Sequence, residues 1–286
     1  MLPLRSLLFM PGDNARAHEK AVDLHADAII FDLEDAVASA NKVSARHCVS
    51  DALQRHNYAN KQLFLRINLY DAELRDNELK FFADHDQFTG LIAPKVESAA
   101  TIQALSKAMQ SAGCAEHQRI AAMIESPEGV LNAQSIAVAD SRVFALIAGT
   151  NDLAESLHLP YNNERIGLTH SLSHIVLAAR AHNCMALDGV YNAIKDPEGF
   201  EKECYHGRVL GFDGKTLIHP TQIAPANRCY APSAEDVAKA KHIIEQYSAQ
   251  KGGVAVADGA MIEELHLRNA QRIMQLHNAI FTNEAE

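Results

Sequence analysis

The sequence lacks the patterns that mark several common classes of protein. Its five cysteines are scattered and form no Cys-x-x-Cys pair, so we expect neither a disulfide framework nor a zinc site, and a reducing cytoplasm is the natural location. The apolar run Leu2–Met10 is too short to span a membrane and lacks the cationic start of a signal peptide. The 36 acidic residues outnumber the 26 Lys and Arg residues, which form no basic run, and this argues against nucleic acid as a partner.

Short apolar runs alternate with amphipathic stretches along most of the chain. The runs are continuously apolar, which is typical of parallel strands covered by helices. Eight strand–helix repeats favour a closed (β/α)8 TIM barrel over an open doubly wound sheet, and no Gly-x-Gly-x-x-Gly motif follows the first run to indicate dinucleotide binding. The expected strands are Arg5–Met10, Ala28–Leu33, Leu63–Ile67, Gly90–Pro94, Arg119–Ile124, Val143–Ala148, Met185–Val190 and Thr216–Ile218.

Helices are expected between these strands and beyond the eighth. The barrel should occupy residues 1–232, and residues 233–286 should form a C-terminal helical extension. The segment from Gly252 to Gly259 is the expected linker, which would let the last helix lie as a lid over a neighbouring subunit. The expected helices are Ala15–Leu24, Lys42–His56, Leu74–Asp84, Ala99–Ala112, Pro127–Ala139, Gly167–His182, Glu198–Leu210, Gln222–Tyr230, Ala234–Gln250 and Met261–Ala279.

Two acidic residues follow neighbouring strands at the point where the active site of such a barrel lies, the carboxyl ends of the strands. Glu125 comes directly after one apolar strand, and Asp152 comes after the next. Two carboxylates that converge on one barrel mouth repel each other and are costly to bury unless a cation lies between them. Because ligation by oxygen alone selects a hard ion, the pair predicts a Mg²⁺ site, with Mn²⁺ as the alternative ion.

Two basic residues at strand ends have two interpretations each. Arg66 can stabilise an oxyanion or a substrate carboxylate, or it can pair with Glu34 or Asp35, and these roles are compatible. Lys95 can form a Schiff base with a carbonyl substrate, although a lysine paired with neighbouring acids is the simpler interpretation.

The remaining polar residues at strand ends also have structural explanations. His219 can donate a proton, but its place before Pro220 favours a structural hydrogen bond. Ser126 and Asn151 can each cap the helix that follows, as serine and asparagine often do.

Seven stretches of the chain carry a family resemblance when they are taken together. They are Arg5–Asn14 (RSLLFMPGDN), Phe31–Val37 (FDLEDAV), Leu65–Asn68 (LRIN), Met123–Pro127 (MIESP), Gly149–Leu153 (GTNDL), Gly211–Pro220 (GFDGKTLIHP) and Asp258–Ile262 (DGAMI). This set resembles the citrate lyase β-subunit-like proteins of the wider HpcH/HpaI aldolase family, which include free-standing malyl-CoA and citramalyl-CoA lyases. The resemblance covers nearly the whole chain.

The resemblance assigns roles to the residues at the strand ends. It implies that Glu125 and Asp152 hold Mg²⁺, with water and substrate oxygens completing the coordination. It implies that Arg66 contacts the thioester or a substrate carboxylate. It also implies that Glu34 and Asp35 hold waters and Arg66 beside the metal.

The resemblance also implies a coenzyme A thioester as substrate, with Arg16 and Lys20 near the first strand as candidates for binding its phosphates. Related lyases draw an acid from an adjacent subunit of a trimer or hexamer, so a homo-oligomer is implied. That acid is commonly the Asp of Met-Ile-Asp, whereas this chain has Met261-Ile262-Glu263. Because glutamate has the same acid–base chemistry with a longer arm, Glu263 is the expected acid.

The expected function is Mg²⁺-dependent cleavage or formation of a 3-hydroxy-3-carboxyacyl-CoA thioester, such as malyl-CoA or citramalyl-CoA, with acetyl-CoA and a 2-oxo acid as the other side of the reaction. A class II pyruvate aldolase that uses free aldehydes would need the metal and the arginine but no coenzyme A pocket. A non-catalytic paralogue would bind acyl-CoA without turnover. A citrate lyase β subunit would act inside a larger complex, although Gly149–Leu153 resembles the free-standing enzymes more.

Overall fold

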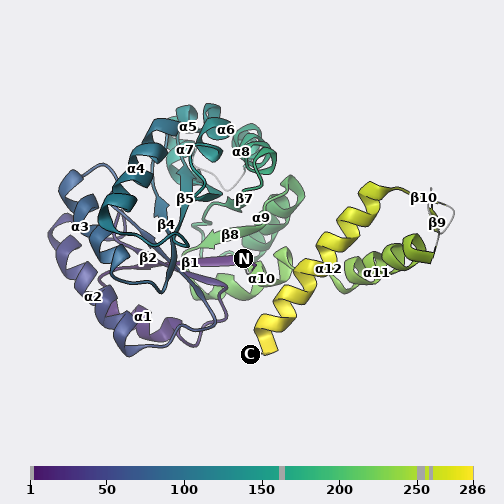
Figure 1. The fold of residues 1–286 in the computed structure, drawn as a ribbon, viewed down its shortest axis with the longest axis horizontal. Coiled ribbons are helices and arrows are strands. Elements are labelled where there is room, and N and C mark those ends of the chain that lie inside the picture. The colour runs from purple at the N-terminus through teal and green to yellow at the C-terminus, as the bar shows by residue number, and fades with distance from the viewer. Residues whose placement is uncertain (1–2, 161–164, 250–254, 258–259, 286) are drawn as a thin grey trace. The chain divides into compact units, whose positions relative to one another are not determined.

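The computed structural model describes residues 3–160, 165–249, 255–257 and 260–285. Its first part is a closed barrel of eight parallel strands surrounded by helices, which confirms the predicted (β/α)8 fold (Figure 1). Each strand pairs with the next one along the chain. The strands are β1 (Ser6–Pro11), β2 (Ala28–Asp32), β3 (Gln62–Arg66), β4 (Phe88–Ala93), β5 (Arg119–Ile124), β6 (Val143–Ala148), β7 (Met185–Asp188) and β8 (Gly214–Leu217).

The barrel closes where β8 runs beside β1, with Ser6 opposite Lys215. A Cβ atom on Gly214 would lie 1.7 Å from the carbonyl oxygen of Leu4, so no other residue fits without moving the backbone. Glycine therefore permits the close approach of first and last strands that closure requires.

Apolar side chains fill the inside of the barrel. Phe64 and Phe144 stack with their ring centroids 5.7 Å apart, and Leu7, Ile92 and Leu187 are buried in the same cluster. The interior is therefore a packed core and not a channel, which leaves the strand ends as the place for polar chemistry. No helix in the described part of the chain is long and apolar enough to cross a membrane.

The helices around the barrel differ from the prediction in two places. The single helix expected at Pro127–Ala139 is two short helices, α5 (Pro127–Leu131) and α6 (Ala133–Ala137), because the backbone at Asn132 leaves helical values. Helix α7 (Thr150–Ser156) is missing from the prediction, since seven residues are too few to show a helical period. The other helices are α1 (Ala15–Ala21), α2 (Lys42–Arg55), α3 (Ala72–Ala83), α4 (Ala99–Ala112), α8 (Thr169–Ala181), α9 (Pro197–Leu210) and α10 (Ile223–Tyr230), with short 3₁₀ helices η1 (Ser39–Asn41), η2 (Ile166–Leu168) and η3 (Pro220–Gln222).

The chain divides into two compact units, one formed by Leu4–Asn227 and the other containing Arg228–Glu286. In the second unit, α11 (Ala234–Ala249) packs against α12 (Glu264–Ala285). The predicted Gly252–Gly253 break lies outside the described residues.

A two-stranded antiparallel sheet joins the two helices of the second unit. It pairs β9 (Ala255–Ala257) with β10 (Ala260–Ile262), and Met261 lies opposite Val256. The prediction that the last helix begins at Met261 is therefore wrong. The β-branched residues Val256 and Ile262 favour an extended backbone over a helix, which agrees with this pairing.

Arg5 and Asp27 form a buried ion pair beside the amino-terminal ends of β1 and β2. We expect this pair to contribute to the stability of the barrel. Asp27 accepts hydrogen bonds from Arg5 Nε at 2.9 Å and from Arg5 Nη2 at 2.8 Å, and its side chain is 6% exposed. We expect Asp27→Ala to lower the free energy of unfolding by roughly 3 kcal/mol, because the buried guanidinium loses this carboxylate. The control Asp51→Ala removes an exposed partner of Arg55 and should cost less than about 1 kcal/mol. Urea unfolding measures both variants, and equal losses would contradict the expectation.

Candidate functional site

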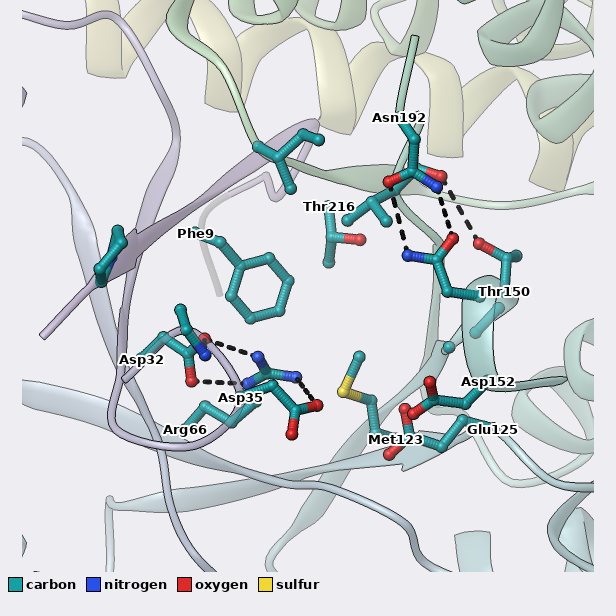
Figure 2. Close-up of a pocket in the computed structure, with 17 residues that line it drawn as sticks. Phe9, Asp32, Asp35, Arg66, Met123, Glu125, Thr150, Asp152, Asn192 and Thr216 are labelled. Atoms are coloured by element: carbon teal, nitrogen blue, oxygen red, sulfur yellow. Dashed lines mark hydrogen bonds and ion pairs between the residues drawn. The ribbon is translucent and has the colours of Figure 1, made fainter. Parts of the chain in front are cut away.

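A cavity with a volume of about 380 Å³ lies at the carboxyl ends of the strands (Figure 2). Residues from the ends of β1, β2, β3, β5, β6 and β8 line it, together with segments that follow β2, β5, β6, β7 and β8. Four of the predicted site residues are among them, namely Asp35, Arg66, Glu125 and Asp152. Residues from distant parts of the sequence therefore meet in one cavity, as the barrel topology requires.

Glu125 and Asp152 form the acidic side of this cavity (Figure 2). Glu125 directly follows β5 and is buried, whereas Asp152 lies in the first turn of α7. Gly149 makes room for the glutamate, because a Cβ atom there would lie 2.3 Å from Glu125 Cβ. Burial raises the pKa of Glu125 to about 7, and the negative charge of Asp152 contributes to this shift. Burial and the neighbouring charge of Asp152 thus destabilise the charged form of Glu125 when no cation is bound.

This pair has the right chemistry for a hard divalent cation. Both ligands are carboxylates, which Mg²⁺ prefers, and their mutual repulsion would be relieved by a positive charge between them. Among the described residues, no group of three or more His, Cys, Asp or Glu side chains is placed to hold a metal. The protein therefore offers two ligands here, and the remaining coordination positions would be filled by water or substrate, as is common for Mg²⁺.

Arg66 lies across the cavity from the acidic pair and is held by several carboxylates (Figure 2). Its Nε and Nη2 atoms donate to Asp32 at 2.8 and 2.5 Å, and its Nη1 atom lies 3.2 Å from Glu34 Oε2. Its guanidinium also lies over the ring of Phe9, 4.8 Å from the ring centroid. The predicted pairing with Glu34 and Asp35 is confirmed, and it is compatible with a contact to substrate.

Asp32 is a site residue at the end of a predicted strand to which the sequence assigned no role. It is the last residue of β2 and lies directly opposite Arg66 in the register of β2 and β3. It is 1% exposed, so its bidentate contact fixes the guanidinium before any ligand arrives. Its role could be inferred only from the register of β2 and β3, which places Asp32 beside Arg66 and which the sequence does not give.

Lys95 follows β4 and pairs with acidic neighbours. Its ammonium group donates to Glu34 and lies 3.3 Å from Asp35 Oδ1. Burial lowers the pKa of Lys95, but the hydrogen bond to Glu34 and the surrounding negative charges outweigh this and raise it above its ordinary value. A lysine that stays protonated is a poor amine nucleophile, so the paired interpretation is favoured over a Schiff base.

The polar residues with structural explanations divide into two groups. Ser126 accepts a hydrogen bond from the Gly129 N–H and caps α5, and His219 caps η3, so both structural interpretations are confirmed. Asn151 does not cap a helix, because α7 begins at Thr150 and the N-cap position belongs to Gly149, which has no side chain. Its amide oxygen instead accepts a hydrogen bond from Asn192 Nδ2 at 2.7 Å, which joins α7 to the segment after β7.

Two further predicted residues are not among those that line this cavity. Arg16 and Lys20 are exposed on α1, which follows β1. Glu263 belongs to the second unit, between β10 and α12, where it is exposed and its backbone N–H donates to His266 Nδ1 at 2.9 Å.

The raised pKa of Glu125 predicts how stability depends on pH in metal-free protein. Its pKa is about 7 in the folded state and has an ordinary value of 4.5, so the folded state binds the proton more tightly. Stability is therefore lost as pH rises from about 4.5 to 7. In the presence of a chelator, Glu125→Gln should be more stable than the unaltered protein above pH 7, by at most about 3 kcal/mol, and this advantage should vanish near pH 4.5. Urea unfolding across this range measures it, and a pH-independent difference would contradict the assignment.

Comparison with known proteins places the sequence among relatives of one family. Residues 5–220 match the family described as HpcH/HpaI aldolase/citrate lyase. The (3S)-malyl-CoA thioesterase of Cereibacter sphaeroides is 41% identical over 281 residues, which cover 97% of this chain and 96% of that protein. The citrate lyase subunit beta of Leuconostoc mesenteroides subsp. cremoris is 35% identical over 96% of this chain and 93% of its own length.

Solved structures show the same relationship. The protein CitE from Mycobacterium tuberculosis, in complex with magnesium, acetoacetate and coenzyme A, has a TM-score of 0.78 and 29% identity, and the match covers 96% of this chain and 98% of that one. A citrate lyase beta subunit from the same organism, complexed with oxaloacetate and magnesium, has a TM-score of 0.68 and 30% identity over 80% of this chain and 98% of that one. By sequence and by structure, the chain belongs to the HpcH/HpaI aldolase/citrate lyase family.

Proposed function

We propose that the protein is a Mg²⁺-dependent carbon–carbon lyase that acts on a 3-hydroxy-3-carboxyacyl-CoA thioester such as malyl-CoA or citramalyl-CoA. The observation that carries this proposal is the placement of Glu125, Asp152 and Arg66 around one cavity. A carboxylate pair suited to a hard cation and a fixed guanidinium can together bind a substrate with several oxygen atoms. Family membership and the magnesium and coenzyme A bound by CitE support the same assignment.

The chain supplies two kinds of group to this reaction. Glu125 and Asp152 would hold Mg²⁺ (with Mn²⁺ as a substitute), which when bound acts as a Lewis acid toward the hydroxyl and carboxylate oxygens of the substrate. Arg66 places a permanent positive charge where the thioester enolate develops as the carbon–carbon bond breaks. Asp32 keeps this guanidinium oriented, so little reorganisation is needed during the reaction. Glu34 and Asp35 lie beside it and hold Lys95 and Arg66.

The reaction requires two proton transfers. The substrate hydroxyl loses its proton as it becomes the carbonyl of the 2-oxo acid, and a water held by the carboxylates can accept it. An acid then protonates the enolate carbon to give acetyl-CoA, and we assign this role to Glu263. We assign the phosphates of coenzyme A to Arg16 and Lys20, which are exposed on α1. The five cysteines all lie among the described residues and form no disulfide there, which suits the reducing cytoplasm that we propose as its location.

Thioester hydrolysis is the second candidate, because a relative that is 41% identical is named a (3S)-malyl-CoA thioesterase. The same metal and arginine would bind the same substrate, but water would attack the thioester carbon and release free coenzyme A. The two reactions therefore differ in the bond that is broken and not in the groups that bind the substrate.

The first test of function combines metal removal with product analysis. Purified protein is incubated with stereoisomers of malyl-CoA and citramalyl-CoA. Chelator should abolish turnover and Mg²⁺ or Mn²⁺ should restore it, while Glu125→Gln and Asp152→Asn should weaken Mn²⁺ binding at least about tenfold because each removes one of two protein ligands. A lyase releases a 2-oxo acid, detected by a hydrazine reagent, and no free thiol. A thioesterase releases free coenzyme A, detected by a thiol reagent, and no 2-oxo acid.

Each remaining outcome points to a different function. Full activity in metal-stripped protein would exclude the metal-dependent mechanism. Turnover of pyruvate with free aldehydes, without inhibition by coenzyme A, would identify a class II aldolase. Acyl-CoA binding without any product would indicate a non-catalytic paralogue, and activity that appears only with partner subunits and a carrier-bound thioester would indicate a citrate lyase β subunit.

We further propose that Glu263 serves the metal site of a neighbouring subunit in a homotrimer or homohexamer, with the second unit acting as a lid. Glu263 is exposed and comes directly after β10, in a compact unit separate from the barrel. Such a lid would exclude water from the site, and the acid that it carries would complete the site only in the oligomer.

Subunit exchange tests this arrangement. Glu263→Ala and Glu125→Gln should each be inactive, and mixing them under exchange conditions should restore part of the activity, because some sites then combine an intact metal pair with an intact acid. Glu263→Asp, with the same charge on a shorter arm, should keep measurable activity. No recovery despite exchange shown by mass spectrometry, or normal activity of Glu263→Ala, would exclude the proposal.

A further inference from the structure

Lys95 contacts both sides of the candidate site. Its backbone N–H donates to Glu125 Oε1 at 2.5 Å, and its ammonium group contacts Glu34 and Asp35. Glu125 is one of the two carboxylates suited to the metal, and Glu34 and Asp35 lie against Arg66. One residue therefore joins the metal carboxylate to the acidic pair beside the arginine.

The backbone of Lys95 lies in the left-handed region, with φ at 55°. Glycine is the usual residue at such a position, because any side chain makes this conformation less favourable. Neighbouring groups hold the residue there, since Tyr70 donates its hydroxyl proton to the Lys95 carbonyl and the N–H of Val96 donates to the Met123 carbonyl at 3.1 Å. The direction of the N–H toward Glu125 depends on this conformation.

The side chain explains why a lysine occupies a position that favours glycine. Asp32, Glu34 and Asp35 together would place three negative charges around the single guanidinium of Arg66. The ammonium group of Lys95 supplies a second positive charge to Glu34 and Asp35. It thereby offsets the charge that would otherwise draw Arg66 or the metal toward that pair.

We propose that Lys95 is a positioning residue with two separable parts: its backbone N–H holds Glu125 in the orientation that receives the metal, and its ammonium group holds Glu34 and Asp35 so that Arg66 stays directed at the substrate. This inference rests on the metal site of the proposed function. The left-handed backbone and the charged side chain are both needed, which is why neither glycine nor an ordinary turn residue would serve.

Two substitutions separate the parts. Lys95→Gly removes the ammonium group but keeps the left-handed backbone and its N–H, whereas Lys95→Ala removes the ammonium group and leaves a strained backbone without the side-chain contacts to Glu34 and Asp35 that help to hold it. The control is Asn183→Gly, which relieves the same conformation (φ 55°) beyond the end of α8. Calorimetry with Mn²⁺ measures the metal site without substrate, and steady-state kinetics separates kcat from KM.

The two variants should differ in metal binding and agree in turnover. Lys95→Gly should bind Mn²⁺ within about threefold of the unaltered protein, and Lys95→Ala should bind it at least about tenfold more weakly. Both should lose about a hundredfold in kcat, with a smaller change in KM, because Glu34 and Asp35 without the ammonium group draw Arg66 away from the substrate. Lys95→Arg should recover part of the kcat, since it returns the charge, and Asn183→Gly should change none of these values.

Other outcomes would overturn the inference in distinguishable ways. If the unaltered protein binds no Mn²⁺, both the metal site and the role of Lys95 fail. If it binds Mn²⁺ and the two Lys95 variants match it in Mn²⁺ affinity and in kcat, with only lower melting temperatures, Lys95 is purely structural and the proposed function stands. Equal loss of Mn²⁺ affinity in the glycine and alanine variants would remove the role of the backbone N–H.

Discussion

The site is organised around one electrostatic constraint, the placement of the buried carboxylate of Glu125 and the half-buried carboxylate of Asp152 in one cavity. Burial and the charge of Asp152 raise the pKa of Glu125 to about 7, so the charged form of Glu125 is destabilised when no cation is bound. The surroundings keep the pair together despite this: Gly149 leaves room for the glutamate, and the N–H of Lys95 binds one of its oxygens. A site that is strained when empty is one that gains most from binding a divalent ion.

On the opposite side of the cavity, neighbouring carboxylates hold Arg66 in place without covering it completely. Arg66 is bound by Asp32 through two hydrogen bonds, and Glu34 and Asp35 are shared with Lys95. A second network of charged residues lies outside this cavity. Asp188 and Lys215 are fully buried and pair at 3.1 Å, Arg165 contacts Asp188, and Lys215 also contacts Glu203 on α9. Asp188, Lys215 and Arg165 are not among the residues that line the cavity with Glu125.

Lyase and thioesterase activities can use the same groups to bind the substrate. Under the proposed function, both reactions would use a cation and a guanidinium around the polar end of a malyl-type thioester, and they would differ in whether the carbon–carbon bond or the thioester bond breaks. The presence of a malyl-CoA thioesterase and citrate lyase β subunits among the relatives is consistent with one binding site that supports different final steps.

The sequence alone predicted the fold class and the convergence of Glu125 and Asp152 on one cavity, because continuous apolar runs at a regular spacing specify a parallel barrel and the carboxyl ends of its strands must converge. It could not reveal Asp32, whose role depends on lying opposite Arg66 in the strand register. Nor could it show the left-handed backbone of Lys95, the seven-residue helix that carries Asp152, or the β10 pairing of Met261. These features were decided only by the tertiary structure, because register, local backbone conformation and charge balance arise from contacts between segments that are distant in the chain.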